Sequence, residues 1–155
     1  MDTAKSAAMN FLAARQRDAN DSIVFDIDDT LIKVRGSEPM REMISLYKFA
    51  EMIGYKMIII TARPYSDDNA QWTVSQLLEI GINPTRIYFA PPMQKGDVKK
   101  ALGFKTILSV GDQWTDLTES DKWIKLPDYS DHRILANINK TSNDSHSLNN
   151  LQTLS

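Results

Sequence analysis

Short apolar runs alternate along the chain with stretches in which apolar residues recur at helical spacing. Residues 57–60 are apolar throughout, as expected of a strand that is buried on both faces. Helical spacing extends over 40–47 and 74–78, and Gly54 and Gly81 follow as helix stops. This alternation predicts β/α units around a parallel sheet, with strands at 23–25, 57–60, 87–89, 107–110 and 123–126.

The order of these elements predicts an α/β fold, a three-layer α/β/α sandwich around a doubly wound, Rossmann-like parallel sheet. We expect the strand at 23–25 to be central and the strand at 123–126 to be the outer one. From Asn137 onward the sequence is rich in Asn, Ser and Thr, which is typical of a tail or a loosely packed segment. The prediction is a single catalytic domain over 1–138 and a polar C-terminal tail over 139–155.

Composition narrows the classes of function. At 155 residues the chain is long enough for one domain with one sizeable core. Its formal net charge of −2 argues against a nucleic-acid binder with a generally basic surface. The absence of cysteine excludes disulfides, thiolate chemistry and cysteine-ligated zinc. No apolar run approaches the length that crosses a bilayer, so we expect a cytoplasmic protein without a membrane partner.

Polar residues directly follow the predicted strands, at the edge where open α/β sheets bind their ligands. The first strand is followed by residues 26–30, Asp-Ile-Asp-Asp-Thr, and the second by residues 61–63, Thr-Ala-Arg. Lys95 comes after the third strand, and Asp112 follows the fourth, with Asp116 four residues on. Because the carboxyl ends of parallel strands meet at one edge, we expect these side chains to converge.

The converging side chains have a consistent chemistry. Several carboxylates close together repel one another unless a cation neutralises them. Oxygen ligands without His or Cys suit a hard ion such as Mg²⁺. The hydroxyl of Thr61 and the ammonium of Lys95 suit an anionic substrate beside that ion, and a phosphate monoester is the obvious candidate. Its transfer needs a nucleophile, charge neutralisation and a proton for the leaving group.

The order Asp-x-Asp-x-Thr, Thr, Lys, Gly-Asp-x-x-x-Asp resembles the four motifs of the haloacid dehalogenase (HAD) superfamily of aspartate-dependent phosphohydrolases. The resemblance extends over about residues 22–126. Residues 59–64, followed by a helix and Gly81, are similar to the small acid-phosphatase-like branch, and polynucleotide 3′-phosphatases share a comparable layout. The resemblance implies a HAD-like fold and a phosphoric monoester hydrolase.

The same resemblance implies a role for each aspartate. Asp26 is expected to attack phosphorus, to form the aspartyl-phosphate and to bind Mg²⁺. Asp28 is expected to protonate the leaving oxygen, to activate water afterwards and to bind the metal through its backbone carbonyl. Asp112 is expected to be a metal ligand, and Asp116 a ligand or a support behind the ligands.

The resemblance also implies that Thr61 and Lys95 bind the phosphoryl group. Thr61 is expected to hydrogen-bond the transferring group, and Lys95 to stabilise the charge on Asp26 and the phosphate together. Lys99 lies on the same predicted short helix, 96–102, and is the rival for this role. Arg63 leaves two alternatives open, a contact with the substrate or an ordinary solvated or ion-paired side chain.

The chain resembles a member of the superfamily without a cap domain. About ten residues separate Thr30 from the next predicted helix, and one helix and one strand fill the interval before Lys95. Members without a cap resemble enzymes that accept large substrates or that borrow a cover from a second subunit. Lys33 and Arg35 offer either a basic rim for such a substrate or a solvated face. Two aromatic residues expected to flank the mouth of the site, Trp72 and Trp114, are interpreted as packing residues rather than as surfaces that bind a substrate.

The predicted function is hydrolysis of a phosphate monoester by a Mg²⁺-dependent phosphatase through an aspartyl-phosphate intermediate. One alternative is a polynucleotide or nucleotide phosphatase, for which nucleic acid is a substrate only. Another is a catalytically inactive HAD-fold binding protein. The phosphorylated substrate, whether small or macromolecular, the oligomeric state and transfer to an acceptor other than water are left open.

Overall fold

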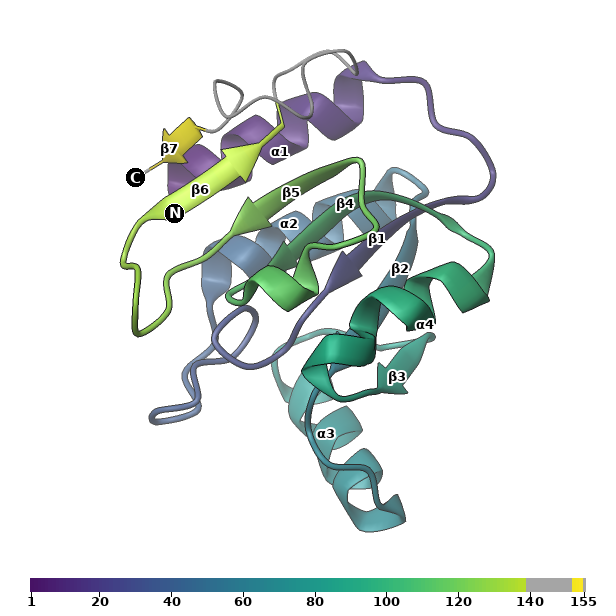
Figure 1. Cartoon of the computed structure of the whole chain (residues 1–155), viewed down its shortest axis with the longest axis vertical. Coiled ribbons are helices and arrows are strands. Elements are labelled where there is room, and N and C mark those ends of the chain that lie inside the picture. The colour runs from purple at the N-terminus through teal and green to yellow at the C-terminus, as the bar shows by residue number, and fades with distance from the viewer. Residues whose placement is uncertain (139–151, 155) are drawn as a thin grey trace.

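The computed structural model of the chain describes residues 1–138 and 152–154 (Figure 1). The strands of this part are β1 (Asp21–Phe25), β2 (Lys56–Thr61), β3 (Ile87–Phe89), β4 (Lys105–Gly111), β5 (Lys122–Lys125), β6 (Ile134–Asn137) and β7 (Gln152–Leu154). The helices are α1 (Asp2–Ala14), α2 (Arg41–Met52), α3 (Asp67–Glu79) and α4 (Lys95–Leu102), with the 3₁₀ helices η1 (Pro92–Gln94) and η2 (Trp114–Asp116).

The strands form one sheet in the order β3-β2-β1-β4-β5-β6-β7. β1 pairs in parallel with both β2 and β4, and β3 and β5 continue the parallel pairing on either side. β6 and β7 then add antiparallel pairs beyond β5. The predicted doubly wound parallel sheet with the first strand inside it is confirmed, and two antiparallel strands extend it.

The prediction that the strand at 123–126 is the outer one is wrong. β5 occupies this position, but a turn reverses the chain after it and brings β6 alongside. The carboxylate of Asp128 holds this turn, because it accepts hydrogen bonds from the backbone N–H groups of Ser130 and Asp131 and from the buried ammonium of Lys125. These contacts are polar and local, so apolar periodicity does not reveal them.

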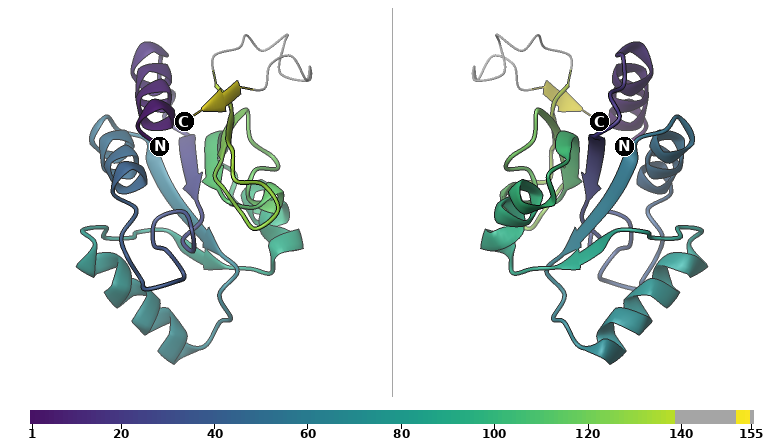
Figure 2. Two further views of the ribbon diagram at one scale, coloured as in Figure 1. Left: turned by 90° about the vertical axis from the view of Figure 1, so that its left-hand side faces the viewer. Right: turned by 90° about the vertical axis from the view of Figure 1, so that its right-hand side faces the viewer.

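Helices cover both faces of the sheet (Figure 2). α1, α2 and α3 lie on one face, and α4 with η2 lies on the other. Neighbouring residues of a strand point to opposite faces. Ile23 and Phe25 of β1 therefore pack in a large apolar cluster that includes Leu46 of α2, whereas Val24 packs in a smaller one with Val98 of α4. The predicted three-layer sandwich is confirmed.

The described residues contain no insertion of the size of a cap domain. Between β1 and α2 the chain forms a short loop in which Ile32 pairs with Pro39. Between β2 and β3 it forms α3 alone. Residues 1–138 and 152–154 therefore contain no domain that covers the carboxyl edge of the sheet.

Residues 139–151 and 155 of the predicted tail lie outside the described residues, and 152–154 form β7 beside β6. The domain boundary after residue 138 stays a prediction. A search of the described helices finds none that is both long and apolar enough to cross a membrane.

An ion pair connects the end of α1 to the start of β1. Arg15 Nη1 donates to Asp21 Oδ2 at 2.8 Å, and the backbone N–H of Asp18 donates to the same oxygen at 2.8 Å. Burial disfavours the charged form of Asp21, but the hydrogen bonds from Arg15 and Asp18 outweigh this effect. They hold the pKa of the Asp21 carboxyl below its usual value.

We expect the Asp21→Asn variant to have a lower free energy of unfolding than the wild type at neutral pH, by roughly 1–3 kcal/mol, because its amide binds the guanidinium poorly. The lowered pKa stabilises the fold above the unfolded-state pKa of about 3.9, and this contribution is lost as the pH falls through the folded-state pKa. Urea unfolding at neutral pH and at about pH 3 should show the difference shrinking in acid. Asp2→Asn, at an exposed site, is the control, and an equal difference at both pH values would contradict the assignment.

Candidate active site

The carboxyl ends of β1 and β4 lie side by side because these strands are neighbours in the sheet. Asp26 directly follows β1, and its backbone N–H donates to the carbonyl oxygen of Val110 at 3.0 Å. A tight turn comes next, in which the carbonyl oxygen of Ile27 accepts hydrogen bonds from the N–H groups of residues 30–32. The turn places the Thr30 hydroxyl 3.3 Å from Asp26 Oδ2, so Thr30 shapes the loop around Asp26.

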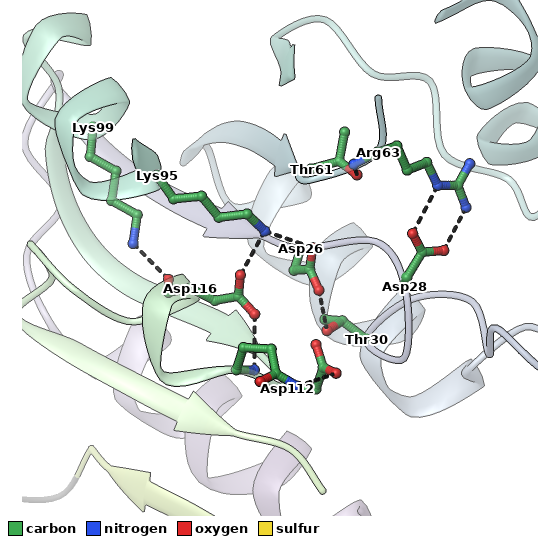
Figure 3. Close-up of polar contacts among 10 residues, drawn as sticks. Asp26, Asp28, Thr30, Thr61, Arg63, Lys95, Lys99, Asp112 and Asp116 are labelled. Carbon is green, nitrogen blue, oxygen red and sulfur yellow. Dashed lines mark hydrogen bonds and ion pairs between the residues drawn. The ribbon is translucent and has the colours of Figure 1, made fainter. Parts of the chain in front are cut away.

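Three carboxylates gather at this point (Figure 3). Asp26, Asp112 and Asp116 each offer an oxygen, and these oxygens lie within 4.8 Å of one another. All three residues are buried. Lys95 brings one positive charge against three carboxylates, so the set fits a further cation, and its all-oxygen chemistry suits a divalent ion of the Mg²⁺ type.

Lys95 is the first residue of α4, and its ammonium points into this acidic cluster. Its Nζ lies 2.9 Å from Asp26 Oδ1 and 2.6 Å from Asp116 Oδ1. Burial would lower the pKa of Lys95, but the charges of Asp26 and Asp116 outweigh burial and raise it. The ammonium therefore stays charged and holds the two carboxylates together.

The single Lys95 ammonium offsets only part of the negative charge of the three carboxylates. Burial raises the pKa of Asp26 well above its usual value, the charge of Asp116 raises it further, and Lys95 opposes both effects. Burial also raises the pKa of Asp112. A bound cation stabilises the ionised forms of such carboxylates, so the electrostatics agree with a metal site.

Asp112 and Asp116 are fixed relative to each other by the residues around them. The backbone N–H of Gln113 donates to Asp116 Oδ2 at 3.0 Å, and its side-chain amide donates to Asp112 Oδ2 at 3.2 Å. A Cβ at Gly111 would overlap the side chain of Asp116, so this close approach requires glycine. Gln113 was not predicted as part of the site, although it lies between the motif residues Asp112 and Asp116.

Lys99 lies one helical turn after Lys95 and points to a different place (Figure 3). Its Nζ donates to the hydroxyl of Ser109 at 2.9 Å and to the carbonyl oxygens of Asp116 and Thr118, each at 2.7 Å. Burial lowers the pKa of Lys99 to about 8. Of the two candidate lysines, Lys95 therefore contacts the Asp26 carboxylate, and Lys99 fastens the segment that carries Asp116.

Asp28 is separate from the acidic cluster, and Figure 3 shows it with Arg63 on the other side of Asp26 from Lys95. Arg63 binds its carboxylate through two hydrogen bonds, Nη2 to Oδ1 at 2.8 Å and Nε to Oδ2 at 3.0 Å. Arg63 also donates to the Thr73 hydroxyl at 3.2 Å and lies over the ring of Trp72 at 5.2 Å. Arg63 is thus ion-paired and anchored to α3.

Thr61 ends β2 and is wholly buried. Its Oγ1 accepts a hydrogen bond from the backbone N–H of Arg63 at 3.1 Å. A cavity of about 450 Å³ lies over the site, lined by Asp26, Asp28, Lys95, Asp112 and Asp116. Thr61 does not line this cavity, although the next residue, Ala62, does.

The structure therefore brings Asp26, Lys95, Asp112 and Asp116 into direct contact and places Asp28 at the same cavity. Lys33 and Arg35, for which the sequence left a basic rim or a solvated face open, line a neighbouring cavity of about 490 Å³. Lys33 is exposed and 3.8 Å from Glu38, a weak surface pair. Trp114 packs edge-to-face on Trp123 but is 51% exposed, and Trp72 is 60% exposed.

The fold has a known relative among solved structures, the class C acid phosphatase from Bacillus anthracis. The two superpose with a TM-score of 0.62 at 18% sequence identity, over 74% of this chain and 61% of that one. At this identity the likeness concerns the fold, and the chain covers about three-fifths of the length of that structure. A search of the curated proteins found no match.

A match to a protein family covers the larger part of the chain. Residues 31–132 match the family described as HAD superfamily, subfamily IIIB (acid phosphatase). The matched region includes Thr61, Lys95, Asp112 and Asp116, and it begins directly after the turn that holds Asp26 and Asp28. On this match, together with the fold, the chain belongs to subfamily IIIB of the HAD superfamily, the acid phosphatase subfamily.

Proposed function

We propose that the chain is a phosphatase that hydrolyses phosphate monoesters with Asp26 as nucleophile and Mg²⁺ as cofactor. The observation that carries the proposal is the setting of the Asp26 carboxylate. This carboxylate lines a cavity and accepts a hydrogen bond from the Lys95 ammonium. Its oxygen is also close enough to oxygens of Asp112 and Asp116 for all three to bind one metal ion. The family to which the chain belongs supports this activity, and so does the acid phosphatase with a similar fold.

Mg²⁺ would be held by carboxylate oxygens of Asp26, Asp112 and Asp116, with the backbone carbonyl of Asp28 as a further predicted ligand. When bound, the ion neutralises charge on the phosphoryl oxygens. Lys95 adds a second positive charge on the side of Asp26 away from Asp28. Thr61 is proposed to donate its hydroxyl hydrogen, which the Arg63 contact leaves unused, to the same phosphoryl group. Because Thr61 is buried and does not line the cavity, this contact requires the backbone at Ala62 to move.

In the first step a carboxylate oxygen of Asp26 attacks phosphorus, and the bond to the leaving oxygen breaks as Asp28 gives that oxygen a proton. In the second step water attacks phosphorus, Asp28 takes its proton, and the bond to Asp26 breaks to release phosphate. Bidentate pairing with a guanidinium is the geometry of an ionised carboxylate. The contact of Asp28 with Arg63 therefore represents the form that acts in the second step, and it has to loosen when Asp28 carries a proton.

Two alternatives remain distinct from this proposal. The open carboxyl edge also suits a polynucleotide or nucleotide phosphatase, which uses the same chemistry on a different leaving group. An inactive binding protein would keep the pocket without turnover. The presence of both Asp26 and Asp28, together with a charged Lys95 in contact with Asp26, favours an active enzyme over a binding protein.

We expect Asp26→Asn to abolish hydrolysis of an unactivated monoester, because an amide forms no acyl-phosphate. We expect Asp28→Asn to lower kcat by roughly 10²–10⁴-fold, the usual contribution of general acid–base catalysis. Phosphate release measures both effects, and far-ultraviolet circular dichroism checks the fold of each variant. Wild-type activity in either variant would refute the mechanism, and an inactive wild type would favour a binding protein.

The two lysines should separate chemistry from stability. We expect Lys95→Met to lower kcat by about 10²–10³-fold, as for loss of one preorganised charge donor. We expect Lys99→Met to lower the free energy of unfolding, by roughly 1–3 kcal/mol for each buried carbonyl left without its donor. Steady-state kinetics and urea unfolding on both variants measure this. If Lys99→Met alone abolished turnover in a protein of unchanged stability, the catalytic role would belong to Lys99.

Removal of the metal should abolish activity, and Mg²⁺ should restore it. We expect Asp112→Asn to raise the Mg²⁺ concentration for half-maximal activity at least about tenfold, in line with the effect of disturbing a metal's surroundings. Calorimetric titration of Mg²⁺ gives the same comparison without turnover. Asp121→Asn, a surface change beside Lys105, is the control. Equal activity in excess chelator would refute a metal-dependent reaction.

A further inference from the structure

The segment that carries Asp116 has little regular structure of its own. Asp116 is the last residue of η2, a 3₁₀ helix of three residues, and the irregular stretch after it includes Glu119 in the left-handed region at a φ of 57°. So short a helix is closed by few hydrogen bonds, and their geometry is poorer than in an α-helix. The position of Asp116 therefore depends on contacts from neighbouring elements.

Lys99 of α4 makes such a contact with the backbone of this segment (Figure 3). Its Nζ donates to the carbonyl oxygens of Asp116 and Thr118, each at 2.7 Å, and to the Ser109 hydroxyl of β4 at 2.9 Å. An ammonium has three hydrogens, so these contacts use all of them. Lys99 is 3% exposed, so water does not compete for these hydrogen bonds. One buried side chain thus joins α4, β4 and the segment that begins at η2.

Helix α4 also lies unusually close to the same segment. A Cβ at Gly96 would be 2.8 Å from Oγ1 of Thr118 and 3.3 Å from Cγ of Glu119, closer than non-bonded heavy atoms usually pack. Lys99 comes three residues after Gly96, and residues at this spacing share one face of a helix. The glycine therefore allows the close approach at which the Lys99 ammonium reaches the carbonyl oxygens.

Two lysines of α4 hold Asp116 at both of its ends. Lys95 Nζ lies 2.6 Å from the Oδ1 atom of Asp116, and Lys99 Nζ lies 2.7 Å from its carbonyl oxygen. The backbone contact determines where the side chain of Asp116 starts, and the carboxylate contact determines where it ends. This precision matters because the Asp116 carboxylate has to lie within 4.8 Å of the oxygens of Asp26 and Asp112 to complete the acidic cluster.

We propose that Lys99 is a positioning residue for the metal site. Through the carbonyl groups of Asp116 and Thr118 it holds the Asp116 carboxylate where one Mg²⁺ ion can reach it together with Asp26 and Asp112. Lys99 does not line the phosphoryl cavity, so it acts on the reaction through the metal site alone. The proposal rests on the proposed function, from which it takes Mg²⁺ as the ion.

The sign of the change in Mg²⁺ affinity distinguishes positioning from charge. Lys99→Met removes a positive charge near a cation site, and the loss of this repulsion alone would tighten Mg²⁺ binding. Loss of positioning has the opposite effect, because the Asp116 carboxylate is then less often in place. We expect calorimetric titration to show a Kd for Mg²⁺ about tenfold higher in Lys99→Met than in the wild type, as for other residues that support a metal's ligands. Unchanged or tighter binding would refute the proposal.

Turnover gives a second reading of the same role. We expect Lys99→Met to need about tenfold more Mg²⁺ for half-maximal phosphate release. Its kcat at saturating Mg²⁺ should stay within about threefold of the wild-type value, because Lys99 touches no reacting group. A large loss of kcat that excess Mg²⁺ does not restore would contradict a role in positioning the metal site.

Tyr55→Phe is the matched control for stability. The Tyr55 hydroxyl donates to the buried backbone carbonyl of Leu12 at 3.0 Å, at the amino edge of the sheet and away from the acidic cluster. Like Lys99→Met, this variant leaves a buried carbonyl without its donor, and we expect both to lower the midpoint of urea unfolding. We expect the Kd for Mg²⁺ to change in Lys99→Met alone. An equal rise in Tyr55→Phe would show that general destabilisation weakens binding, and would refute the proposal.

Ser109→Ala tests which contacts of Lys99 matter. It removes the hydroxyl acceptor in β4 and keeps both carbonyl acceptors, so we expect the Kd for Mg²⁺ to rise by less than about threefold, below the effect of losing the lysine itself. A rise as large as that in Lys99→Met would refute the assignment to the carbonyl contacts. If Lys99→Met does not fold, Lys99→Gln replaces it, with weaker Mg²⁺ binding again the supporting result and unchanged or tighter binding the refuting one.

The binding data separate this proposal from the phosphatase activity. A wild type that binds Mg²⁺ but releases no phosphate would refute the proposed function, and weaker binding by Lys99→Met would still support the positioning role. An active wild type whose Mg²⁺ affinity is unaffected by Lys99→Met would refute the positioning role alone. A wild type without measurable Mg²⁺ binding would refute both.

Discussion

The carboxylates of Asp26, Asp112 and Asp116 lie close together in a buried position, with the Lys95 ammonium as their nearby positive charge. Most features of the site follow from the repulsion between these carboxylates. Asp26 and Asp112 meet because β1 and β4 are neighbours at the point where the chain winds in opposite directions. Asp116 joins them because Gly111 has no side chain and Gln113 binds its carboxylate. Like charges this close are unfavourable, and Lys95 offsets only part of the cost. The remaining unbalanced negative charge is the electrostatic basis of the proposed binding of a cation together with an anionic substrate.

Those parts of the fold that depend on burial were predictable from the sequence. The apolar run at 57–60 identified β2, which is buried over most of its length, and the polar residues after the strands identified the edge of the sheet at which the cavity lies. The edge beyond β5 was not predictable in this way. Its reversal depends on Asp128 binding backbone N–H groups and the Lys125 ammonium, and a single aspartate in a polar loop carries no periodic signal.

The convergence of the candidate side chains was predictable from the sequence, but their individual contacts were not. Lys95 and Lys99 are four residues apart on one helix, and both are 3% exposed, so composition and burial treat them alike. Their difference arises from where α4 begins. η1 ends at the residue before Lys95, so the first helical residue faces Asp26 and the next turn faces the backbone of Asp116 and Thr118. Such a choice depends on three-dimensional register, which spacing alone does not encode.

Arg63 bears on both steps of the proposed reaction, because it pairs with the Asp28 carboxylate that is proposed to give up and then take a proton. Its guanidinium holds the Asp28 carboxylate, yet Asp28 has to carry a proton when the leaving group departs, and a protonated carboxyl is a poorer partner for arginine. Arg63 is itself held by Thr73 and Trp72, both on α3. Helix α3 therefore fixes the position of Arg63 and, through Arg63, that of the proposed proton donor.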